Sequence, residues 1–318
     1  MSTATAVLFV FYRSRRFGPR ALNVAVSCHA VVVTVLALEL CFTFVPRSHG
    51  VGYTYASQLW FRYYWKPINS LKYRDRELDP TDKNRTKVIV VGDSFTTGHG
   101  IKDAKRRFSD LLQDTLGARY RVFNLGRNGS DTRDEMARLQ TFPYKPDVLV
   151  LQYYLNDIEA AAKGRGLHFA GFDLYGDLSG LARPLVARSA LLNYFYWRLP
   201  RKDAAPYTEF LLRGYNDPLV LADHLKDLSE FAQYVKARHA PVILVLIPFL
   251  FDLPASRALL DPIRTFAHQQ NWEVVDVMPY AEQLTLSERV VNNNDAHASE
   301  KVHAWIAASL GTIISEMR

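Results

Sequence analysis

Cysteine is scarce in this 318-residue chain, which has only Cys28 and Cys41, both in one apolar segment near the N-terminus. The rest of the sequence therefore cannot form a disulfide, bind zinc through thiolates or use a cysteine nucleophile. Blocks of lysine and arginine interleaved with aromatic residues are also missing, so a net charge of +7 does not indicate nucleic-acid binding. It indicates only a modest preference for anionic surfaces or substrates.

Residues 21–45 predict a transmembrane anchor. The part at 21–38 has no charged side chain, and about 18–25 such residues cross a bilayer core as a helix. Arginines precede the segment and no acidic residue occurs before Glu39, so the positive-inside rule places residues 1–20 in the cytoplasm. A cleavable signal peptide is the alternative, but no small-x-small cleavage site lies near Glu39. We expect a single-pass membrane protein whose main domain is extracytoplasmic, and periplasmic in a Gram-negative cell.

After a connector at 46–86, the chain alternates between strand-like and helix-like stretches. The connector is rich in Tyr, Trp and Arg, and we expect it to be ordered but irregular, since disordered linkers are poor in aromatic residues. The expected strands are 87–91, 119–124, 147–152, 241–247 and 273–277, and the expected helices lie near 104–116, 131–141, 219–239, 255–270 and 299–316. This alternation predicts an α/β fold at 87–318: a three-layer α/β/α sandwich around a five-stranded parallel sheet.

Residues 163–218 interrupt the alternation and form an expected insert. They contain several glycines and prolines, followed by the aromatic-rich segment LLNYFYWRL at 191–199. The insert could be a lid over a site or a decorating subdomain with a small core of its own. The same aromatic residues could also contact a protein partner or the membrane surface.

The motif Gly92-Asp93-Ser94 follows four β-branched residues at 88–91, which predict a short buried strand. The glycine lets the chain turn sharply and leaves the Ser94 hydroxyl at the carboxyl end of the strand, where open α/β sheets bind ligands. Because a free serine is a poor nucleophile, a catalytic role requires a base and oxyanion donors elsewhere. By itself, the motif could equally be a turn that happens to carry Asp-Ser.

Three later segments contain such groups. The NLGRNG segment at 124–129, after the second strand, contains glycines that could present an unobstructed backbone N–H. Asn156, after the third strand, could donate its amide to an oxyanion. His297, just before the last helix, could act as general base toward Ser94, with Asp295 orienting it. Each segment alone could be a helix cap or a solvated loop, so the prediction depends on their joint placement around one sheet.

These four blocks span residues 88 to about 310 and resemble those of SGNH/GDSL-type serine hydrolases, in particular membrane-anchored bacterial members. The resemblance implies that Ser94 is the nucleophile, His297 the base and Asp295 its orienting residue. It also implies an oxyanion hole formed by the backbone N–H groups of Ser94 and Gly129 and by the Asn156 side chain. It implies no metal and no organic cofactor.

Three positions need comment. The third block of the family usually has a glycine where this chain has Tyr154, which would narrow the pocket or change how the loop turns. The last block often has aspartate where this chain has Asn294, so the orienting role is assigned to Asp295 at a shorter spacing. Thr96 replaces the second glycine of a Gly-x-Ser-x-Gly elbow, which argues against an α/β-hydrolase fold. A flavodoxin-like nucleotide binder also fits poorly, because no glycine-rich phosphate loop follows the first strand.

The expected activity is that of a serine esterase whose acyl-enzyme on Ser94 is hydrolysed by water. The expected location indicates an acylated small molecule, glycan or lipid of the cell envelope as substrate, for example an O-acetyl ester. One alternative is an O-acyltransferase that uses the same residues to acylate an envelope polysaccharide. The other is a non-catalytic, membrane-tethered assembly or binding protein that retains the fold, with the aromatic insert as its contact surface.

Overall fold

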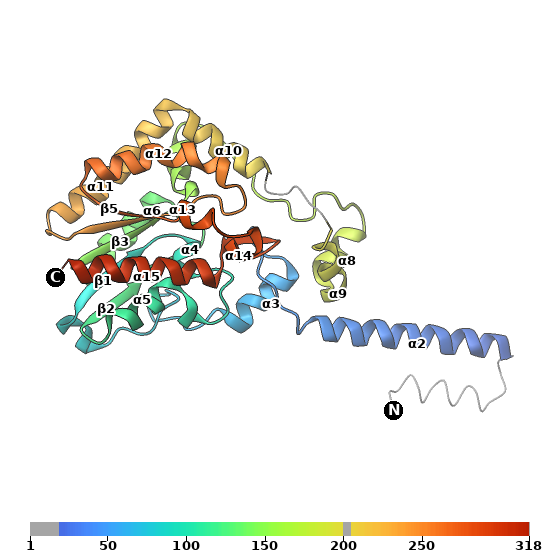
Figure 1. The fold of residues 1–318 in the computed structure, drawn as a ribbon. Helices are drawn as coiled ribbons and strands as arrows, with labels where there is room; N and C mark the ends of the chain where they lie inside the picture. Colours follow the sequence, from blue (N-terminus) through green and yellow to red (C-terminus); the bar gives the residue numbers. More distant parts are fainter. Residues whose placement is uncertain (1–18, 200–204, 318) are drawn as a thin grey trace.

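A five-stranded parallel sheet forms the centre of the protein (Figure 1). The computed structural model describes residues 19–199 and 205–317, so most of the predicted cytoplasmic segment 1–20 lies outside the described residues. The strands are, in spatial order, β2 (Tyr120–Asn124), β1 (Thr86–Val91), β3 (Val148–Tyr153), β4 (Val242–Leu246) and β5 (Glu273–Asp276). Each strand begins and ends within one residue of its predicted bounds, and the predicted parallel sheet is confirmed.

Helices cover both faces of this sheet and produce the predicted three layers (Figure 1). The helices on one face are α5 (Phe108–Leu116) and α15 (Glu300–Glu316), and those on the other are α6 (Thr132–Thr141), α11 (Pro218–Lys236) and α12 (Leu253–Gln269). The predicted helix at 104–116 is interrupted at Arg107, whose backbone is extended. The buried guanidinium of Arg107 donates to the backbone carbonyls of Arg74 and Thr97, which holds the chain out of helical geometry at this point.

Strands β1, β3 and β4 are nearly continuous runs of Val, Ile and Leu, and almost every residue in them is buried. Such runs are typical of parallel strands that helices cover on both faces. Short elements fill the connections: η1 (Pro80–Asn84), α4 (Ser94–Thr97), η2 (Ala104–Arg106), η3 (Leu155–Ile158), α7 (Glu159–Gly164), α13 (Met278–Ala281), α14 (Leu286–Arg289) and the hairpin β6 (Val290–Asn292) and β7 (Asp295–Ala298). The antiparallel β6–β7 hairpin is not among the predicted elements.

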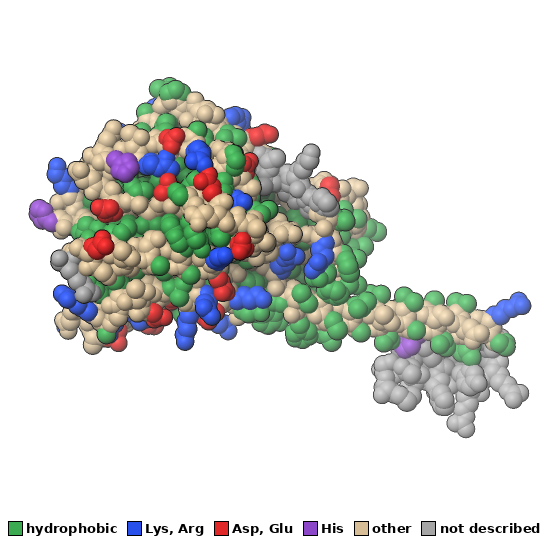
Figure 2. Space-filling view, in the orientation of Figure 1, with side chains coloured by type: hydrophobic (Ala, Val, Ile, Leu, Met, Phe, Trp, Pro, Cys, Tyr) green, Lys and Arg blue, Asp and Glu red, His purple; other side chains and the backbone are tan. Residues whose placement is uncertain are grey.

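Helix α2 (Pro19–Phe42) extends away from this domain, and hydrophobic side chains cover it along its length (Figures 1 and 2). Its most apolar window has a mean hydropathy of 2.2, and no part of that window is buried. The helix is long and apolar enough to span a membrane, in agreement with the predicted anchor at 21–45. It ends a few residues earlier than predicted, before Pro46, because a residue that precedes proline disfavours helical geometry.

The connector at 46–86 is more regular than predicted, because it contains helix α3 (Tyr55–Tyr64). It also packs closely against the sheet domain. Trp60 is only 1% exposed, and the equally buried Arg74 donates hydrogen bonds to the carbonyls of Gly98 and Ile101 at 2.7 and 2.8 Å. The connector therefore supports the loop that follows Ser94.

The insert at 163–218 contains two parts that pack differently. Helix α10 (Ala205–Asn216) contributes Phe210, Leu211 and Tyr215 to the main core. Helices α8 (Ala182–Arg188) and α9 (Ala190–Tyr196) instead belong to a small separate core centred on Tyr175, Tyr196 and Trp197. The α8–α9 part of the insert thus has a small core of its own, while Phe172 and Tyr207 of the insert line the cavity beside Ser94.

Buried histidines make the stability of this fold sensitive to acid. Burial lowers the pKa of His303 and His224 to about 3 and that of His99 to about 4. An unfolded histidine has a pKa of about 6.5, so below that pH the unfolded chain binds protons that the native state does not. Each histidine therefore lowers stability as the pH falls toward its native pKa, by up to about 1.4 kcal/mol per pH unit.

We expect the variant His303→Gln to lose less unfolding free energy than the wild type between pH 7.5 and pH 5. His303 suits this test because its Nδ1 accepts a hydrogen bond only from the Phe108 backbone N–H, at 3.2 Å, which a glutamine oxygen can replace. The measurement is urea denaturation of the full chain in a neutral detergent at both pH values. Equal losses in the two proteins would contradict the assignment of a neutral buried histidine.

Candidate active site

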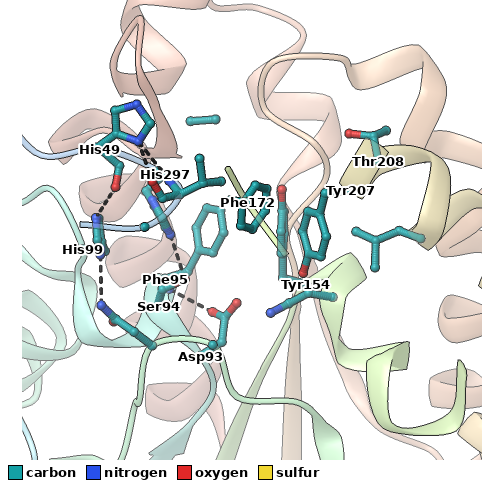
Figure 3. Close-up of a pocket in the computed structure, with 18 of the residues that line it drawn as sticks. His49, Asp93, Ser94, Phe95, His99, Tyr154, Phe172, Tyr207, Thr208 and His297 are labelled. Carbon is teal, nitrogen blue, oxygen red and sulfur yellow. Dashed lines mark hydrogen bonds between the residues drawn. The ribbon is translucent and has the colours of Figure 1, made fainter. Parts of the chain in front are cut away.

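The predicted site residues meet at the carboxyl edge of the sheet. Ser94 and His297 lie together in one cavity of about 430 Å³ (Figure 3). Gly129 and Asn156 also line this cavity, and the Asp295 carboxylate is bonded to His297. Ser94, Gly129 and Asn156 lie in the connections that follow β1, β2 and β3, respectively. Asp295 and His297 lie on β7. Carboxyl ends of parallel strands share one edge of the sheet, which explains why residues so far apart in sequence converge here.

Ser94 begins helix α4 immediately after β1, on a turn that depends on Gly92. A Cβ atom at Gly92 would collide with the side chains of Thr96 and Gln152. The Gln152 side-chain oxygen fills this space and accepts hydrogen bonds from the N–H groups of Asp93 and Thr96, at 3.1 and 3.2 Å. A glycine is required because the neighbouring strand β3 uses that space to hold the turn.

Ser94, His297 and Asp295 form a continuous hydrogen-bonded chain. The distance from Ser94 Oγ to His297 Nε2 is 2.7 Å, and that from His297 Nδ1 to Asp295 Oδ1 is 2.5 Å. Burial alone would raise the pKa of Asp295, but the adjacent His297 and His99 outweigh it and hold that pKa well below its usual value. Because Asp295 is then a carboxylate, Nδ1 of His297 carries the proton and Nε2 is free to accept one from Ser94.

The β6–β7 hairpin explains the short spacing between Asp295 and His297. Both residues lie on β7, where side chains two positions apart point to the same face. Asn294, one residue earlier, is directed elsewhere, and its amide donates to the Trp197 carbonyl at 2.6 Å. The structure therefore places Asp295, and not position 294, against the histidine.

The oxyanion donors that the sequence predicts stand around the same cavity. Gly129 adopts a φ of 71°, in the left-handed region that favours glycine. Within the described residues, neither the Ser94 nor the Gly129 backbone N–H donates to any acceptor, so both remain available to a ligand. The Asn156 amide donates a long hydrogen bond of 3.3 Å to the Ser130 carbonyl and also interacts with the Asp93 carboxyl group.

Removing the Asn156 amide is expected to slow ester hydrolysis without unfolding the protein. Losing one oxyanion donor typically lowers kcat by about 10²–10³-fold, or about 2.7–4 kcal/mol. We expect this loss for Asn156→Ala, measured with short-chain nitrophenyl esters, and no more than a small change for Asn216→Ala, an exposed amide at the end of α10. Unchanged kcat in Asn156→Ala would exclude the residue from the oxyanion hole.

His99 is a residue of this site that the sequence analysis missed. Its ring stacks on His297, with 4.3 Å between centroids, and on Trp60 at 5.7 Å on its other side. Its Nε2 donates to the His49 carbonyl and its Nδ1 accepts from the Asn128 amide, both at 3.0 Å. Burial and the neighbouring His297 lower the pKa of His99 to about 4, so His99 is uncharged at neutral pH. Its ring packs against that of His297 and holds it in position.

The segment that follows α2 lies along the loop that carries Asp295. The Gly50 N–H donates to the Asn294 carbonyl at 2.8 Å, and the Asn292 amide donates to the Ser48 carbonyl at 3.3 Å. Arg47 Nε donates to the Asn292 side-chain oxygen at 3.0 Å. The segment directly after the candidate anchor is therefore hydrogen-bonded to the β6–β7 hairpin, which carries Asp295 and His297.

Phenylalanine and tyrosine rings form a large part of the cavity wall. Tyr154 packs against Phe95 and Phe249, with ring centroids 4.5 and 5.8 Å away, and so forms a wall where the family usually has glycine (Figure 3). The insert adds Phe172 and Tyr207 to this wall. An apolar cavity of this size suits the acyl part of an ester.

The same region contains the one potential metal-ligand cluster of the described residues, formed by His99, Asp295 and His297, whose ligand atoms lie within 4.8 Å of one another. These atoms already serve hydrogen bonds that a metal would break. His99 Nε2 donates to the His49 carbonyl, and the Asp295 carboxylate is bonded to His297 Nδ1. The donor set fits a serine-activating triad better than a metal centre.

Several solved structures are similar to this chain. A solved member of the lipolytic protein G-D-S-L family from Veillonella parvula has 14% sequence identity and a TM-score of 0.44, with 72% of this chain and 98% of that chain covered. TesA has 18% identity and a TM-score of 0.46 over 73% of this chain and 99% of its own. The acetyl xylan esterase AlAXEase has 16% identity and a TM-score of 0.44 over 72% of this chain and 99% of its own.

These structures resemble this chain in fold. None of the curated proteins compared with it matches. The model of the GDSL-like lipase/acylhydrolase family matches residues 90–305, a range that contains all five predicted site residues. The chain therefore belongs to the GDSL-like lipase/acylhydrolase family of esterases and hydrolases.

Proposed function

We propose that this protein is a membrane-anchored serine esterase that uses Ser94 to cleave an acyl ester of a cell-envelope glycan or lipid. The observation that carries the proposal is the chain from Ser94 Oγ to His297 Nε2 at 2.7 Å and from His297 Nδ1 to Asp295 at 2.5 Å. A hydroxyl that faces an unprotonated imidazole nitrogen at this distance can lose its proton as it attacks.

In the proposed reaction, His297 Nε2 takes the Ser94 proton while Oγ forms a bond to the ester carbonyl carbon. The carbonyl oxygen becomes an oxyanion, which the Ser94 and Gly129 N–H groups and the Asn156 amide stabilise. When the intermediate collapses, the bond to the alcohol breaks and His297 returns the proton to the departing oxygen. Water then repeats the sequence on the acyl-enzyme, with Asp295 stabilising the imidazolium in both halves.

The proposed location and substrate class rest on two features. Helix α2 is apolar enough to span a membrane, and the arginines before it favour a cytoplasmic N-terminus. The aromatic cavity beside Ser94 suits an acyl group. A reporter that is active only in the cytoplasm should therefore be silent when it is fused after Arg318, and activity there would contradict the proposed orientation.

Labelling with a fluorophosphonate probe tests the esterase proposal. Full-length wild-type protein in a neutral detergent should be labelled, and Ser94→Ala should not. If no Ser94-dependent labelling and no hydrolysis of short acyl esters occurred, the proposal would fail and a non-catalytic tethered protein would be favoured. Product analysis with and without a glycan acceptor then separates hydrolysis from O-acyl transfer.

A further inference from the structure

A second cavity, of about 660 Å³, adjoins the candidate active site. We call it the arginine cavity, after Arg47 and Arg198, which both line it. Residues 49–51 form a wall that it shares with the cavity beside Ser94, and Phe251 and Ala296 also line both. A ligand in the arginine cavity would therefore lie next to a ligand in the catalytic one.

Among the described residues, the arginine cavity is lined by two arginines and by a single carboxylate, that of Asp295. Burial lowers the pKa of Arg47 and the charge of Arg198 lowers it further, while Tyr194 and Asp295 act in the opposite direction. Arg47 is bonded to the neutral Asn292 side chain, and Arg198 to the Tyr194 hydroxyl. Neither forms an ion pair with a carboxylate of the described residues, and Asp295, on the same wall, is already bonded to His297. Two arginine side chains on the wall of one cavity are well suited to a phosphate.

Helix α9 lies beside the end of the candidate membrane helix α2 (Figure 1), and the residues that follow α9 line the arginine cavity. Glu39, in the last turn of α2, accepts hydrogen bonds from the Ser189 hydroxyl at 2.7 Å and the Leu191 N–H at 3.1 Å. The Phe42 ring lies 4.5 Å from that of Tyr194. An acidic residue near the end of an apolar helix thus holds the start of α9 beside α2.

The α8–α9 region also exposes an apolar surface beside α2. Its members are between 42% and 80% exposed: Leu181, Leu185, Leu192, Phe195 and Leu199. Because this surface adjoins a helix that can span a membrane, lipid is the occupant that the neighbouring structure favours. Leu199 also lines the arginine cavity, so the apolar surface and the two arginines are continuous.

We propose that the arginine cavity binds the phosphate group of a lipid in the membrane that α2 spans. The proposal rests on the membrane-anchored esterase proposed above and narrows its substrates to phosphate-bearing lipids. Arg47 and Arg198 contact the phosphate oxygens, while the exposed apolar residues of the α8–α9 region contact the lipid tails. The shared wall at 49–51 brings an ester of the same lipid toward Ser94.

Lipid binding to full-length protein tests the proposal. The Ser94→Ala background prevents turnover, and native mass spectrometry from a neutral detergent measures retention of phosphatidylglycerol, of diacylglycerol with the same chains, and of inorganic phosphate. We expect phosphatidylglycerol to bind at least about tenfold more tightly than diacylglycerol, and Arg47→Gln with Arg198→Gln to remove this preference. The matched control, Arg183→Gln with Arg188→Gln, removes two exposed charges of α8 that lie outside the cavity and should leave the preference intact.

Three results would overturn the proposal. These are equal retention of the two lipids, equal loss of phosphatidylglycerol in both double variants, and arginine-dependent binding of inorganic phosphate without binding of the phospholipid.

Arg198→Gln alone, at an exposed position, should still weaken phosphatidylglycerol binding if the Arg47 change disturbs the neighbouring loop. Fluorophosphonate labelling of the double variant with Ser94 intact reports the esterase site separately. Retained labelling with lost lipid binding supports a binding role for the arginines.

Discussion

Replacing Ser94 or His297 by alanine should lower kcat for ester hydrolysis by about 10⁵–10⁶-fold, and the double variant should be no slower than either single variant. The reason is that the two side chains act as one unit. Without the imidazole 2.7 Å away, the Ser94 hydroxyl has no group to accept its proton, and without Ser94 the imidazole has no nucleophile to activate.

Steady-state kinetics with a short-chain ester measure this effect, and active-site titration corrects for inactive protein. The remaining rate should still exceed the uncatalysed rate, because the oxyanion donors are unchanged. Independent, multiplicative losses in the double variant would show that Ser94 and His297 do not work together in one reaction.

Asp295→Asn should lower kcat by about 10⁴-fold while the fold is retained. The carboxylate holds the proton of His297 on Nδ1, through a contact of 2.5 Å. An amide in its place can donate to Nδ1, which favours the tautomer with a proton on Nε2. That tautomer cannot accept the Ser94 proton.

Asn294 supplies the matched comparison for this prediction. Asn294→Ala should change kcat only a little, because its amide is directed to the Trp197 carbonyl and not to His297. Adding Asn294→Asp to Asp295→Asn should not restore activity, for the same reason. A rescue would show that position 294 can reach the histidine and that the Asp295 assignment is wrong.

Local sequence patterns predicted the sheet and the site residues for a physical reason. Buried parallel strands must be apolar on both faces, so β1, β3 and β4 stand out as short runs of Val, Ile and Leu. Once the strands are parallel, their carboxyl ends share an edge. The residues that follow them, Ser94, Gly129 and Asn156, must then lie near one another.

The support around the site could not be predicted in this way. His99 is an ordinary loop histidine in the sequence, and its role depends on Trp60, Asn128 and the His49 carbonyl, which no periodic pattern connects to it. The short Asp295–His297 spacing is explained by the β6–β7 hairpin, because both residues lie on strand β7, where side chains two positions apart point to the same face. Glu39 accepts hydrogen bonds from Ser189 and Leu191, and no sequence pattern connects these positions.

The sequence by itself determined the apolar helix, the five-stranded parallel sheet and the set of residues that meet at its carboxyl edge. The reason is that apolar runs, and the alternation of strand-like with helix-like stretches, are local features of a sequence. Only the tertiary structure decided which groups surround those residues. The contact between Arg47 and Asn292 joins positions 245 residues apart, and the arginine cavity exists only because the chain after α2, the end of α9 and the β6–β7 hairpin meet there. Such contacts depend on how separate elements pack, which no local pattern records.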